Sequence, residues 1–105
     1  MRIGSLLLTV TLAACTGASS TGIAEMSCPT DSTLTYASFG DAFIRDNCLS
    51  CHSHEKPRLS TQAQVQTNAS AILEAAVYTD AMPEKASLSL AERERLGEWL
   101  SCGAP

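Results

Sequence analysis

The hydrophobic positions of the chain repeat at helical spacing, and no segment alternates as a strand would. Between residues 36 and 48 the stripe has the spacing i, i+3, i+4, i+7 and i+8 and consists of Tyr36, Phe39, Gly40, Phe43 and Ile44. This period predicts one face of an α-helix, and Thr35 or Ser38 would cap its N-terminus.

Two short helices with a break between them are expected next. The first covers residues 62–67 and ends at Asn68, and the second runs to Tyr78. The apolar stripe of the second helix consists of Ala69, Ile72, Leu73, Ala76 and Val77. Segment 80–83 is predicted to be irregular, because the residue before Pro83 is pushed out of the α region.

A last helix is predicted to begin at Ser89, where Ser89 and Glu92 fit a capping box, and to end at Gly103. Its buried stripe consists of Leu96, Trp99 and Leu100. The sequence shows no alternating pattern, no repeat and no glycine-rich phosphate-binding motif. It therefore predicts a small all-α domain of about four short helices.

The first stretch of the chain has the composition of a secretory signal. Arg2 precedes the apolar run 5–12, which is far shorter than the roughly 20 residues that span a bilayer. The run ends in Leu-Ala-Ala-Cys15, which resembles the lipobox of bacterial lipoproteins. That resemblance implies that residues 1–14 are removed and that Cys15 is lipidated. The alternative is an ordinary signal peptide that is cut nearby.

Residues 15–34 are polar and, through Gly22, consist mainly of Thr, Ser, Gly and Ala. A segment of this composition buries too little apolar surface to order itself, so we expect a flexible tether. The domain then comprises residues 35–105. A core of about 70 residues usually needs an additional staple, such as a disulfide or a bound group.

The chain is acidic. It has 7 basic and 11 acidic residues and a formal net charge of −4, and loss of Arg2 with the signal brings this to about −5. This acidic charge does not indicate a basic surface that would bind nucleic acid. A partner protein steered by charge would carry a basic face.

The stretch Cys48-Leu-Ser-Cys51-His52 carries the most specific chemistry of the sequence. It matches the C-x-x-C-H pattern of c-type haem attachment. Two thiols at this spacing can each bind one vinyl group of a single porphyrin, and the next residue can ligate the iron through its imidazole. The sequence therefore predicts one covalent haem c, whose burial would supply apolar area that a small core lacks.

Three other interpretations of this motif remain open. A redox dithiol of the thioredoxin type normally lies near a βαβ pattern, which the sequence lacks. A structural zinc site needs four ligands, and the cysteines and histidines of residues 48–54 are crowded together without a distant second pair. A structural disulfide leaves the adjacent His52 unexplained.

Residues 36–105 resemble class I c-type cytochromes. The resemblance is carried by the helix before C-x-x-C-H, by a Met82-Pro83 pair thirty residues after His52, and by a closing helix with an aromatic residue. In that family a glycine eight positions before the first cysteine lets the first and last helices cross closely, and Gly40 has this position. Ile44 stands where the family has an aromatic residue.

By this resemblance, His52 is the proximal and Met82 the distal ligand of the iron. The alternative for Met82 is a side chain that fills space in the core. The family's loop after the motif supplies a proline carbonyl to the proximal imidazole, and Pro57 is the only proline in that region. His54 is assigned no ligand role. The nearby cations, without an assigned role toward the haem propionates, are Lys56, Arg58 and Lys85.

The two remaining cysteines, Cys28 and Cys102, are available for a disulfide in an exported protein. In the cytochrome family the first and last helices pack together, and here Cys28 precedes the first helix while Cys102 ends the last. The resemblance therefore implies a bridge between them that would staple the small domain.

These expectations describe an electron carrier and not an enzyme. With His52 and Met82 both bound, the iron has no open position, and the haem would pass single electrons between redox partners. The lipid would hold the protein at the periplasmic side of a membrane, with the outer membrane favoured because Thr16, not aspartate, follows Cys15. The alternatives are a haem sensor, an enzyme that reduces peroxide or nitric oxide at an open sixth site, and a haem subunit of a larger oxidoreductase complex.

Overall fold

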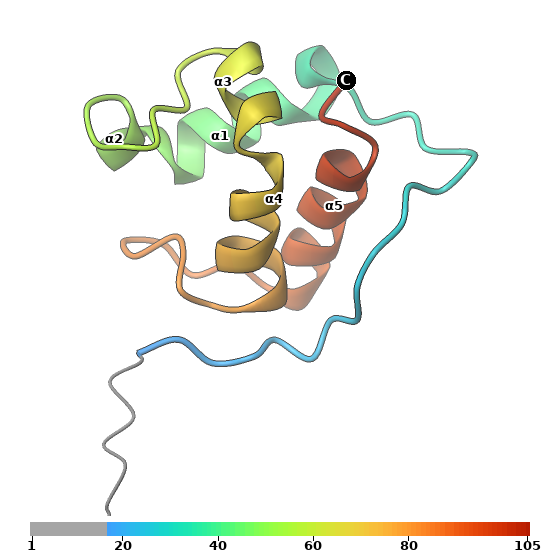
Figure 1. The fold of residues 1–105 in the computed structure, drawn as a ribbon, viewed down its shortest axis with the longest axis horizontal. Helices are drawn as coiled ribbons and strands as arrows, with labels where there is room; N and C mark the ends of the chain where they lie inside the picture. The colour runs from blue at the N-terminus through green and yellow to red at the C-terminus, as the bar shows by residue number, and fades with distance from the viewer. Residues whose placement is uncertain (1–16) are drawn as a thin grey trace, which may run out of the picture.

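Helices make up the regular structure of the protein (Figure 1). The computed structural model describes residues 17–105, so the predicted signal segment 1–14 and the predicted lipid site Cys15 lie outside the described residues. The helical elements in chain order are η1 (Tyr36–Gly40), α1 (Asp41–Asn47), α2 (Leu49–His52), α3 (Gln62–Thr67), α4 (Ala69–Ile72), η2 (Leu73–Tyr78) and α5 (Leu90–Ser101). The π-helical turn η1 continues directly into α1, and α4 continues into the π-helical turn η2.

The helices begin where the sequence supplies capping residues. The hydroxyl of Thr35 accepts a hydrogen bond of 3.0 Å from the backbone N–H of Ser38, and that of Ser89 accepts one of 3.1 Å from Glu92. Thr61 caps α3 in the same way. These bonds satisfy N–H groups that the first helical turn leaves without partners. The predicted cap at Thr35 and the predicted capping box at Ser89 are confirmed.

The predicted break at Asn68 is also confirmed. Asn68 ends α3 and precedes α4, and its side chain donates a hydrogen bond of 2.8 Å to the carbonyl of Gln64. The backbone angles of Asn68, φ −102° and ψ 11°, depart from the helical range and separate α3 from α4.

The first helical segment meets α5 where Gly40 lies against Trp99. The predicted stripe of α5 is buried, with Leu96 and Trp99 fully inaccessible to solvent and Leu100 at 2% exposure. A Cβ atom at Gly40 would overlap the Trp99 ring. The backbone of Gly40 has ordinary helical angles, φ −64° and ψ −44°, so this position needs a small residue and not an unusual conformation. The close approach predicted for Gly40 is confirmed.

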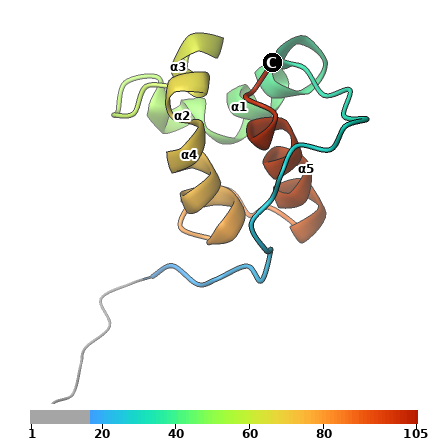
Figure 2. The same ribbon diagram turned by 45° about the vertical axis from the view of Figure 1, so that its right-hand side comes forward.

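Residues 19–34, here called the strap, run in extended form along the helical domain (Figure 1, Figure 2). Ser20 forms an isolated antiparallel bridge with Thr79, and hydrogen bonds of 3.0 Å flank it on both sides. Three apolar side chains of the strap pack against the core: Ile23, Met26 and Leu34. The prediction of a flexible tether over residues 15–34 is therefore wrong for the strap, because composition does not register these backbone bonds and anchored side chains.

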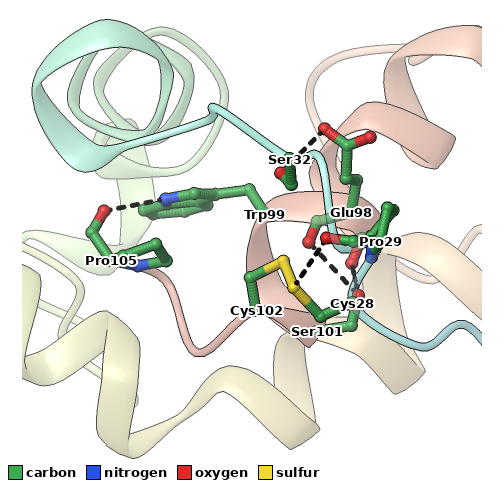
Figure 3. Close-up of a disulfide and its surroundings, with 9 residues drawn as sticks. Cys28, Pro29, Ser32, Glu98, Trp99, Ser101, Cys102 and Pro105 are labelled. Atoms are coloured by element: carbon green, nitrogen blue, oxygen red, sulfur yellow. Dashed lines mark hydrogen bonds between the residues drawn. A yellow bond between two sulfur atoms is a disulfide. The ribbon is translucent and has the colours of Figure 1, made fainter.

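A disulfide joins the strap to the C-terminal end of α5 (Figure 3). The Cα atoms of Cys28 and Cys102 are 4.6 Å apart across a sequence separation of 74 residues. Nearby, the Ser32 hydroxyl donates a hydrogen bond of 3.2 Å to the carboxylate of Glu98. The predicted Cys28–Cys102 bridge is present.

The predicted all-α class is confirmed for the part of the chain that the structure describes. Within residues 17–105 the isolated bridge is the only β pairing, and no sheet forms. Across these same residues, none of the helices combines the length and the apolar composition that crossing a membrane requires.

Candidate functional site

A cavity of about 190 Å³ gathers the cysteine motif and Met82 in one place. It lies between α2, the α4–η2 segment and the loop that follows Thr79, and it is partly open to solvent. The apolar part of its wall includes Phe43, Leu59, Ile72, Ala76, Pro83 and Leu88. The side chains of Cys48, Cys51, His52 and Met82 line the same cavity. The fold thus brings together two segments that are thirty positions apart in the sequence.

The two cysteines of the motif are one helical turn apart. Cys48 lies at the junction of α1 and α2, and its carbonyl accepts the backbone N–H of His52 at 2.9 Å, which closes the turn that carries all three residues. Both Cys48 and Cys51 are free thiols. Burial raises the pKa of the Cys48 thiol to about 11. The attacking thiol of a redox dithiol has a lowered pKa, so Cys48 does not have that character.

The imidazole of His52 is oriented by the loop that follows α2. Its Nδ1 lies 2.8 Å from the carbonyl oxygen of Pro57. A carbonyl only accepts, so Nδ1 carries a proton, and in the neutral ring Nε2 keeps its lone pair. The backbone of this loop is also tied, because Leu59 donates its N–H to the carbonyl of His52 at 2.9 Å. The proline carbonyl expected beside this imidazole is present, and Nε2 is left available as a ligand.

Met82 reaches the cavity from the segment after η2, and its backbone is held at both ends. Its N–H donates to the carbonyl of Ala75 at 2.8 Å. Its carbonyl accepts a hydrogen bond of 2.9 Å from Nη1 of Arg93. The side chain is partly buried against the core. The thioether is therefore presented from a fixed backbone position.

Of the other candidate residues in the sequence, one lines the cavity and the rest lie outside it. Lys85 lines the cavity, together with the exposed Glu55 and Glu84. Lys56 and Arg58 are exposed and do not line it. His54 is exposed and outside the cavity, with Nδ1 3.2 Å from the hydroxyl of the neighbouring Ser53.

Sequence patterns alone do not single out Arg93, although one signal was available. Arg93 precedes Leu96 by three positions and Leu100 by seven, so it lies on the buried stripe of α5. A charged residue on such a stripe indicates a buried group with specific partners. The structure provides those partners as backbone carbonyls, one of them that of Met82.

The cavity offers two thiols, an imidazole nitrogen and a thioether within apolar walls. Such soft donors suit a transition metal or a group that contains one. Within residues 17–105, however, no three His, Cys, Asp or Glu side chains are close enough together to hold a bare metal ion, so a zinc clasp has no ligand set there. The chain matches no protein-family model, no curated protein and no solved structure.

Proposed function

We propose that the protein is a membrane-tethered, periplasmic c-type cytochrome of class I that carries one covalent haem and transfers single electrons between redox partners. The observation that supports this most is the convergence of Cys48, Cys51, His52 and Met82 on one apolar cavity. Local spacing explains why the first three lie together. It does not explain Met82, which the fold brings to the same place.

The residue types that line the cavity suit a haem, which is larger than the cavity of about 190 Å³ and would extend through its open side. The apolar wall suits the flat face of a porphyrin, and the exposed charged residues at the cavity are Lys85, Glu55 and Glu84. The Nε2 atom of His52 keeps its lone pair because Nδ1 donates to Pro57. The free thiols of Cys48 and Cys51 are the groups that would hold the haem covalently.

When bound, the haem supplies an iron that accepts and releases one electron at a time. His52 and Met82 would be the iron ligands, with the imidazole kept in one tautomer and orientation by the Pro57 carbonyl. With His52 and Met82 both bound to it, the iron would have no position left for peroxide or a gas. This ligand set therefore supports a carrier.

The titratable groups around the cavity also favour an electron carrier over an enzyme. Apart from the motif itself, the titratable side chains that line it are Glu55, Glu84 and Lys85, and all three are exposed. Acid–base catalysis on a bound molecule needs a group positioned within hydrogen-bond reach of it, commonly with an adjusted pKa. His54, the only other histidine of the chain, lies outside the cavity.

A lipid on Cys15 would hold the domain closer to the membrane than a long tether would. The strap is bonded to the domain from Ser19 onward. Only three residues therefore lie between Cys15 and Ser19, the first anchored position, and the four Cα–Cα steps reach about 14 Å at full extension. We expect the domain to exchange electrons at the membrane surface that anchors it, with the outer membrane favoured by Thr16.

The partners would be redox proteins with a basic docking face. The chain is acidic, with a formal net charge of −4, and complementary charge steers the encounter of two proteins. Such steering weakens as salt is added, because exposed charges are screened within about 10 Å at 0.1 M ionic strength.

Covalent haem attachment is the decisive test of this function. The full chain, exported by a bacterium that attaches haem to its own exported cytochromes, should stain for haem after denaturing gel electrophoresis. Replacement of both Cys48 and Cys51 by Ser should abolish the stain. The matched pair Cys28→Ser and Cys102→Ser, outside the cavity, should retain it. A wild-type chain that is exported and correctly folded but does not stain would rule the function out.

A further inference from the structure

Arg93 is the one buried charged side chain in the described part of the chain, at 6% exposure. Its Nη1 atom donates hydrogen bonds to three backbone carbonyls: 2.7 Å to Ala76, 2.9 Å to Met82 and 3.4 Å to Thr79. The ion pairs within residues 17–105 are made by Arg45 and not by Arg93. The buried guanidinium is therefore balanced by carbonyl dipoles and not by a carboxylate.

The three carbonyls belong to the end of η2 and to the segment that follows it. The last carbonyls of a helix have no partners within the helix, and a positive charge at that end is favourable. Arg93 supplies both the charge and the donors from α5, which packs on η2. It thereby joins α5, the end of η2 and Met82.

Met82 is held by this arrangement on both sides of its own Cα atom. Its N–H is bonded to Ala75, and its carbonyl is bonded to Arg93, which also binds the carbonyl of Ala76. Two adjacent residues of η2 thus fix the backbone of Met82, one directly and one through the guanidinium. A ligand whose backbone is already ordered loses less conformational freedom when it binds.

We propose that Arg93 is a positioning residue that keeps the thioether of Met82 in the cavity as the sixth ligand. This inference rests on the proposed function and adds to it the residue that secures the distal ligand. All three bonds come from Nη1, at the far end of the guanidinium. A lysine would preserve the charge, but its side chain is shorter and its ammonium would not reach the same point. Arg93→Lys is therefore expected to weaken the hold on Met82, and Arg93→Met to remove it.

The test compares Arg93→Met and Arg93→Lys with Arg95→Met in the haem-loaded full chain. Arg95 is a matched control on the same helix, since it is exposed and its guanidinium lies over the Phe39 ring, 5.4 Å from the centroid. Both Arg93 variants should retain the haem stain. They should lose the weak near-infrared sulfur-to-iron band at a lower temperature than that of global unfolding, and their reduced forms should bind carbon monoxide. Arg95→Met should behave as the wild type.

Amide hydrogen exchange gives a readout that does not depend on the iron. Loss of the Arg93 contacts should raise the exchange rate of the Met82 amide roughly tenfold or more in both variants, with no comparable rise in α1. Variants that stain for haem, keep the sulfur-to-iron band up to global unfolding and leave Met82 exchange unchanged would overturn the role of Arg93. A wild-type chain without the stain would instead overturn the proposed function, so the two failures are distinguishable.

Discussion

At the scale of single residues, the contact between the first helical segment and α5 depends on the small size of Gly40. A Cβ atom there would overlap the ring of Trp99, which is fully buried and cannot move aside. Gly40→Ala gains about 1 kcal/mol of helix propensity, but overpacking a rigid core costs more. We expect a net loss of about 2 kcal/mol in the free energy of unfolding, measured by urea denaturation.

The control for this variant is Gly17→Ala. An added Cβ atom at Gly17 meets nothing within 4 Å, so the same chemical change should leave stability unaltered. Equal stability of Gly40→Ala and the wild type would contradict the close contact with Trp99.

The partly buried thiol of Cys48 leads to a prediction about pH for the haem-free chain. Burial raises its pKa from 9.0 to about 11, so the folded state disfavours the thiolate. The stability that this thiol contributes is fully present below about pH 9 and is lost as the pH rises toward about 11. Pulsed alkylation read by mass spectrometry should show a rate at Cys48 that rises about tenfold per pH unit over this range.

The same chain unfolded in urea serves as the control for the alkylation experiment. There the rate at Cys48 should level off near pH 9.0, the unperturbed pKa. A folded chain whose rate levels off at the same pH would show that Cys48 is not buried in the cavity.

Single residues differ in how far the sequence predicts them. Cys48, Cys51 and His52 are neighbours along the chain, so any helical turn brings them together. The close contact of Gly40 with the last helix was predicted because the cytochrome pattern has a glycine at this position. The role of Arg93 was not predicted from the sequence, because its hydrogen-bond partners are backbone carbonyls of a distant turn. Every residue has such a carbonyl, so a pattern of side chains does not identify these partners.

At the scale of elements, α5 depends on the cap at its N-terminus. The Ser89 hydroxyl accepts the N–H of Glu92 at 3.1 Å, and the Glu92 carboxylate accepts the N–H of Ser89 at 3.1 Å. The backbone N–H of Ser89, and secondarily its hydroxyl, lower the pKa of the Glu92 carboxyl by hydrogen bonding to it. Ser89→Ala should lower the free energy of unfolding by about 1 kcal/mol.

Thermal unfolding of Ser89→Ala and Ser87→Ala, compared side by side, checks this expectation. Ser87 is an exposed residue of the preceding loop, so its replacement should have no effect. Similar shifts in both variants would mean that the loss does not come from the cap.

Elements were predictable where local chemistry defines them and unpredictable where it does not. The capping boxes, the stripe of α5 and the break at Asn68 follow from side chains within a few positions of one another. The strap does not, because it is ordered by a bridge to Thr79 and by a few apolar anchors such as Met26, which contacts Gly97. Those contacts exist only after η2 and α5 have folded.

At the scale of the whole molecule, the disulfide links the strap to the C-terminal end of α5. The bridge between Cys28 and Cys102 spans 74 residues. In the chain-entropy model, closure of a loop of this length stabilises the folded state by about 4.5 kcal/mol. Urea unfolding of the double variant Cys28→Ser and Cys102→Ser should show a loss of this order.

Reduction of the wild-type disulfide provides an independent comparison. In the haem-loaded protein Cys48 and Cys51 would be bound as thioethers, so a mild reductant would act on Cys28 and Cys102 alone. Reduced wild type and the double variant should unfold together. A loss below about 1 kcal/mol in both would show that the strap and α5 stay together without the bridge.

The convergence of His52 and Met82 on one cavity is a property of the whole fold. Sequence spacing predicted the cysteine motif directly, but Met82 could be assigned only through the resemblance to class I c-type cytochromes. The structure supplies the physical link, since η2 carries Ala75 and α5 carries Arg93, and both bind the backbone of Met82.

The most direct test of a His52/Met82-ligated haem is the optical spectrum of the purified, exported protein. Ligation by His52 and Met82 predicts a low-spin oxidised spectrum with a weak near-infrared sulfur-to-iron band, and a reduced spectrum that does not respond to carbon monoxide. Met82→Ala should keep the covalent haem, lose the band and bind carbon monoxide. A high-spin wild-type spectrum, or ready binding of carbon monoxide by the wild type, would contradict this ligation.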